Sequence, residues 1–233
     1  MLPEIEGGWE IQSFPLRGAG SLRLHVPRTP EGLLDDADVI ERNRFNDSMP
    51  YWAWVWDSAP LVVERLADRP SPSGARVLEL GAGLGLVGIA AALLADGPVD
   101  LTLTDHDPLA LEALRANAAL NGLDDARIVE LDWHRPEGVL DGAFDLVLGC
   151  DVAYEAKLHG PLLEVVDGCL AAEGRALFAD PGRTRLPGFV RRAEARGFRV
   201  DLIDAEGAAC EPSPSGFRLA TLTRSPATDS GAR

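Results

Sequence analysis

Residues 77–88 read Val-Leu-Glu-Leu-Gly-Ala-Gly-Leu-Gly-Leu-Val-Gly: an apolar strand, a glycine turn and the beginning of a helix. Glycine accepts positive φ angles, and without a Cβ it lets backbone amides come close to a ligand. A glycine turn alone is weak evidence, since such turns also serve as plain helix caps. Directly after an apolar strand, the turn predicts a binding site for a nucleoside.

Strands and helices alternate after this turn, as in β-α-β units. We expect strands at 76–80, 101–104, 127–131, 144–149 and 176–179, and helices at 84–94, 108–120, 155–170 and 187–195. Two further strand candidates, 198–204 and 217–223, have no helix between them and are expected to pair antiparallel. That ending resembles the class I methyltransferase sheet. The predicted fold class is therefore α/β, a Rossmann-like doubly wound seven-stranded sheet with an antiparallel last strand.

The remaining residues predict a small extension at one end and a tail at the other. We expect an N-terminal extension at 1–70, a core at 71–224 and a flexible tail at 225–233. Alternating apolar residues within 9–27 indicate a hairpin, which an acidic connector with helical potential links to an aromatic and then helical stretch at 51–66. The extension should pack on the core, whereas the small, polar tail should fray.

Composition excludes several classes of protein. Apolar residues make up 46% of the chain and charged residues 25%, which is typical of a globular protein and not of a disordered or fibrous one. The net charge of −15 opposes binding to nucleic acid or anionic lipid, and would favour a cationic substrate. We expect the acidity to serve mainly solubility.

The cysteines and histidines predict neither disulfides nor a metal site. Cys150, Cys169 and Cys210 are odd in number, and neither they nor the four histidines have a spacing typical of metal ligands. The first residues lack the basic and apolar pattern of a signal peptide, and no apolar run reaches the roughly 18 residues of a membrane-spanning helix. We therefore expect a cytoplasmic protein.

The glycine spacing distinguishes between two nucleoside cofactors. Nicotinamide cofactors are usually bound by G-x-G-x-x-G, whereas here the third glycine, Gly85, comes one residue early, which points to S-adenosylmethionine. The next strand ends at Asp105, 20 residues after Gly85, where α/β folds place an acid that accepts both ribose hydroxyls. An alternative role for Asp105 is to cap the following helix, although Asp107 fits that position better.

Other residues near the predicted strand ends complete a candidate cofactor site. Asp132 could accept a hydrogen bond from the adenine amine and Trp133 could cover the ring, although a structural role for Trp133 is equally plausible. Glu79 could hold the methionine amino group or could equally bind backbone amides of the loop. The loop itself would contribute Gly81, Ala82, Gly83 and Gly85.

Together these segments resemble a known family. Residues 50–59, the glycine loop, Asp105, 131–133 and 149–154 are similar to the seven-β-strand protein lysine methyltransferases, from about Tyr51 to Arg183. The similarity is strongest to the electron-transfer-flavoprotein β-subunit lysine methyltransferases, partly through residues 180–183. The resemblance implies that S-adenosylmethionine is the cofactor and S-adenosylhomocysteine the product. It also implies that Trp56 and Cys150 lie beside the cofactor.

The family's acid-x-x-aromatic motif matches Asp151 and Tyr154, and the resemblance makes them the catalytic pair. Asp151 could orient an incoming ammonium, and Tyr154 could form an aromatic wall for it. The alternatives are that Asp151 caps a helix starting near Glu155 and that Tyr154 only packs. No Asn-Pro-Pro-Tyr or Asp-Pro-Pro-Tyr, the motif of base and glutamine methylation, is present.

The acceptor implied by the resemblance is a protein that presents a lysine. Three other functions stay open: methylation of a small-molecule or natural-product amine, non-catalytic binding of adenosylmethionine, and, disfavoured by the glycine spacing, nicotinamide-dependent oxidation. A basic stretch is expected to be a solvated helix face, or alternatively a partner surface; it comprises Arg183, Arg185, Arg191, Arg192, Arg196 and Arg199.

Overall fold

The computed structural model describes residues 2–35, 39–41, 49–136 and 143–225. Its centre is a seven-stranded sheet with the order β5-β4-β3-β6-β7-β9-β8. The strands are β3 (Arg76–Leu80), β4 (Asp100–Asp105), β5 (Arg127–Glu130), β6 (Phe144–Cys150), β7 (Leu170–Asp180), β8 (Phe198–Ile203) and β9 (Arg218–Arg224). Strands β3 to β7 are parallel, and β9 is antiparallel to both of its neighbours. The predicted sheet is therefore confirmed.

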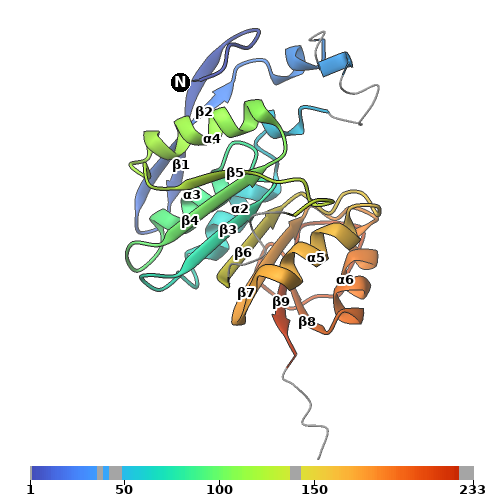
Figure 1. Cartoon of the computed structure of the whole chain (residues 1–233). Helices are drawn as coiled ribbons and strands as arrows, with labels where there is room; N and C mark the ends of the chain where they lie inside the picture. Colours follow the sequence, from blue (N-terminus) through green and yellow to red (C-terminus); the bar gives the residue numbers. More distant parts are fainter. Residues whose placement is uncertain (1, 36–38, 42–48, 137–142, 226–233) are drawn as a thin grey trace, which may run out of the picture.

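Helices cover both faces of this sheet (Figure 1). They are α2 (Ser58–Leu66), α3 (Leu86–Leu93), α4 (Pro108–Leu120), α5 (His159–Cys169) and α6 (Leu186–Ala195), with short 3-10 turns η1 (Pro30–Leu34) and η2 (Tyr51–Ala53). Apolar residues of α2, α3 and α4 share one core cluster, and those of α5 and α6 share the other. The sheet is thus doubly wound, with a core on each side.

The N-terminal hairpin is present and packs beside α4 (Figure 1). It consists of β1 (Trp9–Leu16) and β2 (Gly20–Pro27). Two asparagines of α4 hold β2: Asn117 accepts from the His25 amide at 2.7 Å, and Asn121 accepts from the Arg23 amide at 3.0 Å. The fully buried Asn117 also donates to the Leu84 carbonyl at 2.9 Å. The hairpin is therefore connected to the loop that follows β3.

Two predicted boundaries were wrong near the motif residues. The helix expected at 155–170 begins only at His159, because the backbone from Asp151 to Leu158 forms a loop that starts with a left-handed residue, Asp151, at φ +59°. The helix expected from residue 84 begins at Leu86, because Gly85 adopts φ +86° as its N-cap. Strand β7 starts at 170 rather than 176, and its pairing with β6 contains a register shift.

Two sequence expectations fall partly outside the described residues. Of the acidic connector, residues 36–38 and 42–48 lie outside, and of the expected tail only Ser225 is described. Within the described residues, no helix is both long and apolar enough to cross a membrane.

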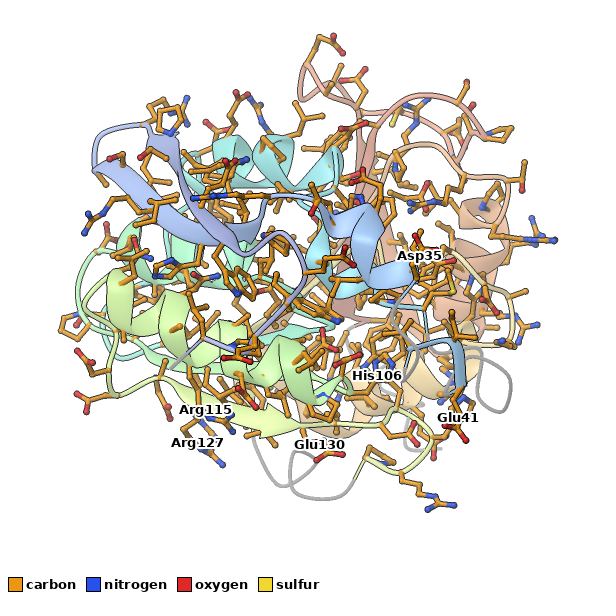
Figure 2. The ribbon with its side chains drawn as sticks, turned by 90° about the horizontal axis from the view of Figure 1, so that it is seen from above. Asp35, Glu41, His106, Arg115, Arg127 and Glu130 are labelled. Atoms are coloured by element: carbon orange, nitrogen blue, oxygen red, sulfur yellow. The ribbon has the colours of Figure 1, made fainter. Side chains whose placement is uncertain are left out.

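The carboxyl ends of the parallel strands meet at one edge of the sheet. The loops that follow them contain residues 81–85, 106–107, 131–135, 151–158 and 181–185. In Figure 2, Arg115, Arg127 and Glu130 extend outward along α4 and β5, whereas His106, just after β4, lies nearer the middle of the molecule. Open α/β sheets bind ligands at this edge.

Candidate active site

A cavity of about 600 Å³ opens at the carboxyl edge of the sheet. Every predicted site residue except Gly85 lines it: Trp56, Glu79, Gly81, Ala82, Gly83, Asp105, Asp132, Trp133, Cys150, Asp151 and Tyr154. The volume lies within the roughly 300–1,000 Å³ of small-molecule sites. Side chains from separate loops are thus brought to one place.

The glycine loop requires glycine at two positions because of its own surroundings. Gly81 and Gly83 have φ angles of +63° and +54°. A Cβ on Gly81 would lie 2.8 Å from the Val152 side chain, and one on Gly83 would lie 3.0 Å from the carbonyl oxygen of Trp52. The loop therefore presents bare backbone to the cavity.

The packing around Gly85 gives this position a structural reason to be glycine, beside the predicted role at the cofactor. Gly85 lies outside the described lining of the cavity, and a Cβ there would lie 2.9 Å from Leu114 and 3.0 Å from Ile89. Close packing and the left-handed backbone conformation at the start of α3 both explain why this position is a glycine.

Asp105 is an organised carboxylate with 6% of its surface exposed. One oxygen accepts from the backbone amides of His106 and Asp107, at 2.8 and 3.0 Å, and the other accepts from Gly83 at 2.9 Å. Burial raises the pKa of this carboxyl above its ordinary value. The capping role belongs to Asp107, which accepts from the Leu109 amide at 2.9 Å, so Asp105 is available to the cavity.

Glu79 is almost fully buried and reaches the first turn of α3. Its Oε2 accepts from the Gly88 amide at 2.8 Å. Burial, with a smaller contribution from the charge of Asp105, raises the pKa of Glu79 to about 8. The carboxyl also lines the cavity, so both roles considered from the sequence are compatible with its position.

Asp132 and Trp133 follow β5 and border the glycine loop. Asp132 accepts from the His134 amide at 2.9 Å. The Trp133 ring would lie 3.2 Å from a Cβ on Gly81, and it also packs against the core cluster on the α5 side. Trp133 therefore serves as a wall of the cavity and as a packing residue at the same time.

Asp151 is held by an arginine that sequence reasoning had placed elsewhere. Its side chain is 3% exposed and forms an ion pair with Arg183. The Arg183 guanidinium also lies 5.7 Å from the centre of the Trp56 ring. The expectation that Arg183 belongs to a solvated helix face was wrong, because this residue precedes α6 and turns back towards the cavity. Asp151 does not cap α5, whose N-cap is Leu158.

Aromatic side chains form the wall next to this ion pair. Tyr51 contacts Tyr154 edge to face at 5.8 Å between ring centres, and Trp56 at 6.0 Å. Tyr51 and Trp56 are 42% and 36% exposed. Tyr51 was not among the predicted site residues, although the run of aromatic residues at 51–56 was a usable signal. This wall can contact a cation.

Cys150 lines the cavity, and its side chain is a neutral thiol. Burial, together with the charges of Asp151 and Glu79, raises its pKa well above the ordinary value. The thiol lies 3.6 Å from a carboxylate oxygen of Asp151. Among the described residues, no group of histidine, cysteine or acidic side chains could hold a metal ion.

Comparison with known proteins identifies the family. The family model described as "Lysine methyltransferase" matches residues 43–194, and this chain belongs to that family. It is 34% identical over 143 residues to the rat electron transfer flavoprotein beta subunit lysine methyltransferase, covering 60% of this chain and 54% of the relative. It is 32% identical over 167 residues to the mouse EEF1A lysine methyltransferase 3, covering 70% of each.

A third relative, zebrafish protein N-lysine methyltransferase METTL21A, is 40% identical over 121 residues, covering 49% of this chain and 54% of the relative. The chain thus spans about half the length of the rat and zebrafish relatives. A TehB-like SAM-dependent methyltransferase from Corynebacterium glutamicum shares the fold, with a TM-score of 0.58, 24% identity and coverage of 70% of this chain and 88% of that one.

Proposed function

We propose that this chain is an S-adenosylmethionine-dependent methyltransferase that methylates a lysine side chain of a protein. The observation that carries the proposal is that one cavity contains both the glycine loop and the Asp151–Tyr154 motif. Donor and acceptor groups would therefore meet at one edge of the sheet. The family, and relatives whose names specify protein lysine methylation, support this acceptor.

The residues of the cavity suit adenosylmethionine. Gly81 and Gly83 keep backbone exposed where a nucleoside would lie, and Asp105 would accept from the ribose hydroxyls. Asp132 and Trp133 would border the adenine ring, and Glu79 would hold the methionine amino group. The cofactor would supply an electrophilic methyl group on a sulfonium. No protein nucleophile is needed for its transfer, which agrees with the neutral state of Cys150.

The acceptor side would work by positioning an uncharged amine. A lysine must lose its proton before it attacks, and burial of the amine against the rings of Tyr51, Trp56 and Tyr154 would lower its pKa. Asp151 is neutralised by Arg183, so its role would be to hold this ion pair and the loop, rather than to meet the ammonium with a free carboxylate. Alignment would supply most of the catalysis.

We further propose a cytoplasmic protein with a protein substrate. The three cysteines are unpaired in the structure, which suits a reducing compartment. The net charge of −15 would attract a basic segment around the target lysine and would disfavour nucleic acid.

Transfer of a labelled methyl group tests the proposal. The purified protein would be incubated with methyl-labelled adenosylmethionine and lysate from cells that lack it, and labelled protein would be hydrolysed for amino-acid analysis. We expect label in methyl-lysine, and much less with Tyr154→Ala. Label confined to small molecules would instead indicate an amine metabolite as acceptor, and cofactor binding without any transfer would indicate a non-catalytic protein.

A further inference from the structure

A second cavity, of about 370 Å³, lies between the beginning of α5 and helix α6. Its described lining includes Arg185, Arg191 and Arg192 and contains no aspartate or glutamate. In a chain with a net charge of −15, this concentration of positive charge is a local exception. The proposed methyl transfer does not involve this second cavity.

His159, the first residue of α5, lines this cavity and is only 1% exposed. Its Nε2 lies 2.9 Å from the carbonyl oxygen of Ala153, and because a carbonyl can only accept, Nε2 must carry the proton. The other ring nitrogen, Nδ1, is buried without a hydrogen-bond partner among the described residues. Buried polar atoms usually form at least one hydrogen bond, so Nδ1 keeps the capacity to accept one.

Gly188 in α6 keeps the space beside this imidazole open. A Cβ at Gly188 would lie 3.9 Å from Cε1 of His159 and 4.0 Å from a terminal nitrogen of Arg191. The edge of the imidazole and the guanidinium therefore face the same hollow. The imidazole also packs edge to face against Phe189, at 5.4 Å between ring centres, which helps to hold its orientation.

We propose that this cavity binds a phosphate group, with Arg191 and Arg192 binding its ionised oxygens and His159 Nδ1 sharing a proton with another oxygen. Guanidinium groups match phosphate oxygens in geometry and charge. Burial and the neighbouring arginines lower the pKa of His159, so its Nδ1 is an acceptor at neutral pH. Hydrogen phosphate carries a hydroxyl that can donate to it, whereas a carboxylate or sulfate does not.

The test is a calorimetric titration with inorganic phosphate at constant ionic strength. We expect saturable binding of one phosphate per chain, weakened by about tenfold or more in the double variant Arg191→Ala/Arg192→Ala, since both guanidinium groups and their charged hydrogen bonds are removed. Arg196→Ala is the matched control, because Arg196 is exposed at the end of α6 and outside the described lining. Absence of binding in the wild type, or equal binding in the double variant and the control, overturns the proposal.

A second measurement addresses His159 without replacing a buried residue. In protein with ¹⁵N-labelled histidine, phosphate should shift the Nδ1 resonance of His159 and leave that of exposed His106 unchanged. Sulfate should bind more weakly than phosphate, and equal binding of the two would contradict the role of Nδ1. A phosphoserine peptide and its unphosphorylated form, titrated at about pH 6 where much of the monoester keeps its hydroxyl, distinguish the source. Tighter binding of the phosphopeptide than of phosphate supports a phosphoprotein ligand, and the reverse supports free phosphate.

Discussion

Gly81 illustrates how one residue combines a backbone and a packing requirement. Its φ of +63° disfavours any side chain, and a Cβ would also lie 2.8 Å from Val152 and 3.2 Å from Trp133. We predict that Gly81→Ala weakens adenosylhomocysteine binding by about tenfold or more, because a shift of roughly 1 Å in a positioning loop has effects of this size. Isothermal titration calorimetry measures this change.

Gly122 provides the matched control for this prediction. It has a similar φ of +72°, but a Cβ there would meet nothing within 4 Å. Gly122→Ala should carry a backbone cost of about 1–2 kcal/mol and leave cofactor affinity unchanged. Equal affinity of the Gly81→Ala and wild-type proteins would show that the loop does not form the binding site.

The raised pKa of Glu79 should make the free energy of unfolding depend on pH. Its pKa rises from 4.5 in the unfolded chain to about 8 in the fold, so the native state binds this proton more tightly. The contribution of Glu79 to the free energy of unfolding is therefore fully present below pH 4.5 and is lost as the pH rises to about 8. The loss amounts to a few kcal/mol at most, by the usual relation of about 1.4 kcal/mol per pH unit.

Glu79→Gln removes this titration while retaining an oxygen for the Gly88 amide. Chemical denaturation of the cofactor-free protein from pH 5 to pH 8 should show the stability of the variant increasing relative to that of wild type. A constant difference between the two proteins across this range would contradict the assignment.

At the residue scale, eleven of the twelve predicted site residues line the cavity, but the partner of Asp151 was not predicted. The glycines and Asp105 follow strands and were placed by their spacing, whereas the family resemblance supplied Asp151 and Tyr154. Arg183 lies 32 positions from Asp151 in the chain, and its contact depends on how the loop after β7 turns back. Gly85 lies outside the described lining, and glycine spacing alone does not distinguish a glycine that faces a cavity from one that permits close packing.

At the scale of elements, two asparagines of α4 hold the hairpin to the core. Asn117 is fully buried and bonds to His25 and to the Leu84 carbonyl, whereas Asn121 makes similar bonds to Arg23 at a half-exposed position. We predict that Asn117→Ala costs about 2–4 kcal/mol, because buried backbone groups lose their partners. Asn121→Ala should cost about 1 kcal/mol or less, since water can replace the amide.

Urea denaturation of the two variants measures this difference. Equal losses of stability would show that the hairpin contributes no more at the buried position than at the exposed one. Such a result would contradict the view of the extension as part of the core of the fold.

The loop after β6 depends on the Asp151–Arg183 ion pair. We predict that Arg183→Met lowers stability by about 1–3 kcal/mol, because it leaves a buried carboxylate without its partner. Adding Asp151→Asn should restore part of the loss, since asparagine tolerates the left-handed backbone and carries no charge. A double-mutant cycle should give a coupling energy on the order of 1 kcal/mol. Purely additive effects would contradict the ion pair.

Element boundaries were predicted least well in the loop between β6 and α5, which contributes residues to the cavity. The apolar pattern at 155–170 favoured one helix, but residues 155–158 belong to the loop that also places Tyr154 at the cavity. Periodicity cannot detect this, because Ala156 and Leu158 in the loop continue the apolar pattern of the helix. The sheet was predicted correctly, since its strands contain short apolar runs that mostly alternate with helices along the chain.

At the scale of the whole molecule, the doubly wound sheet is what assembles the site. Five parallel strands end at one edge, so loops far apart in sequence contribute to one cavity. The hairpin and α2 lie on one face and α5 and α6 on the other (Figure 1). We therefore propose that this cavity binds adenosylmethionine through the glycine loop.

The most direct test is a calorimetric titration of the wild-type protein with adenosylhomocysteine and, separately, with NAD. We expect saturable binding of one adenosylhomocysteine per chain and no detectable binding of NAD. Binding of NAD without binding of adenosylhomocysteine would contradict the proposal.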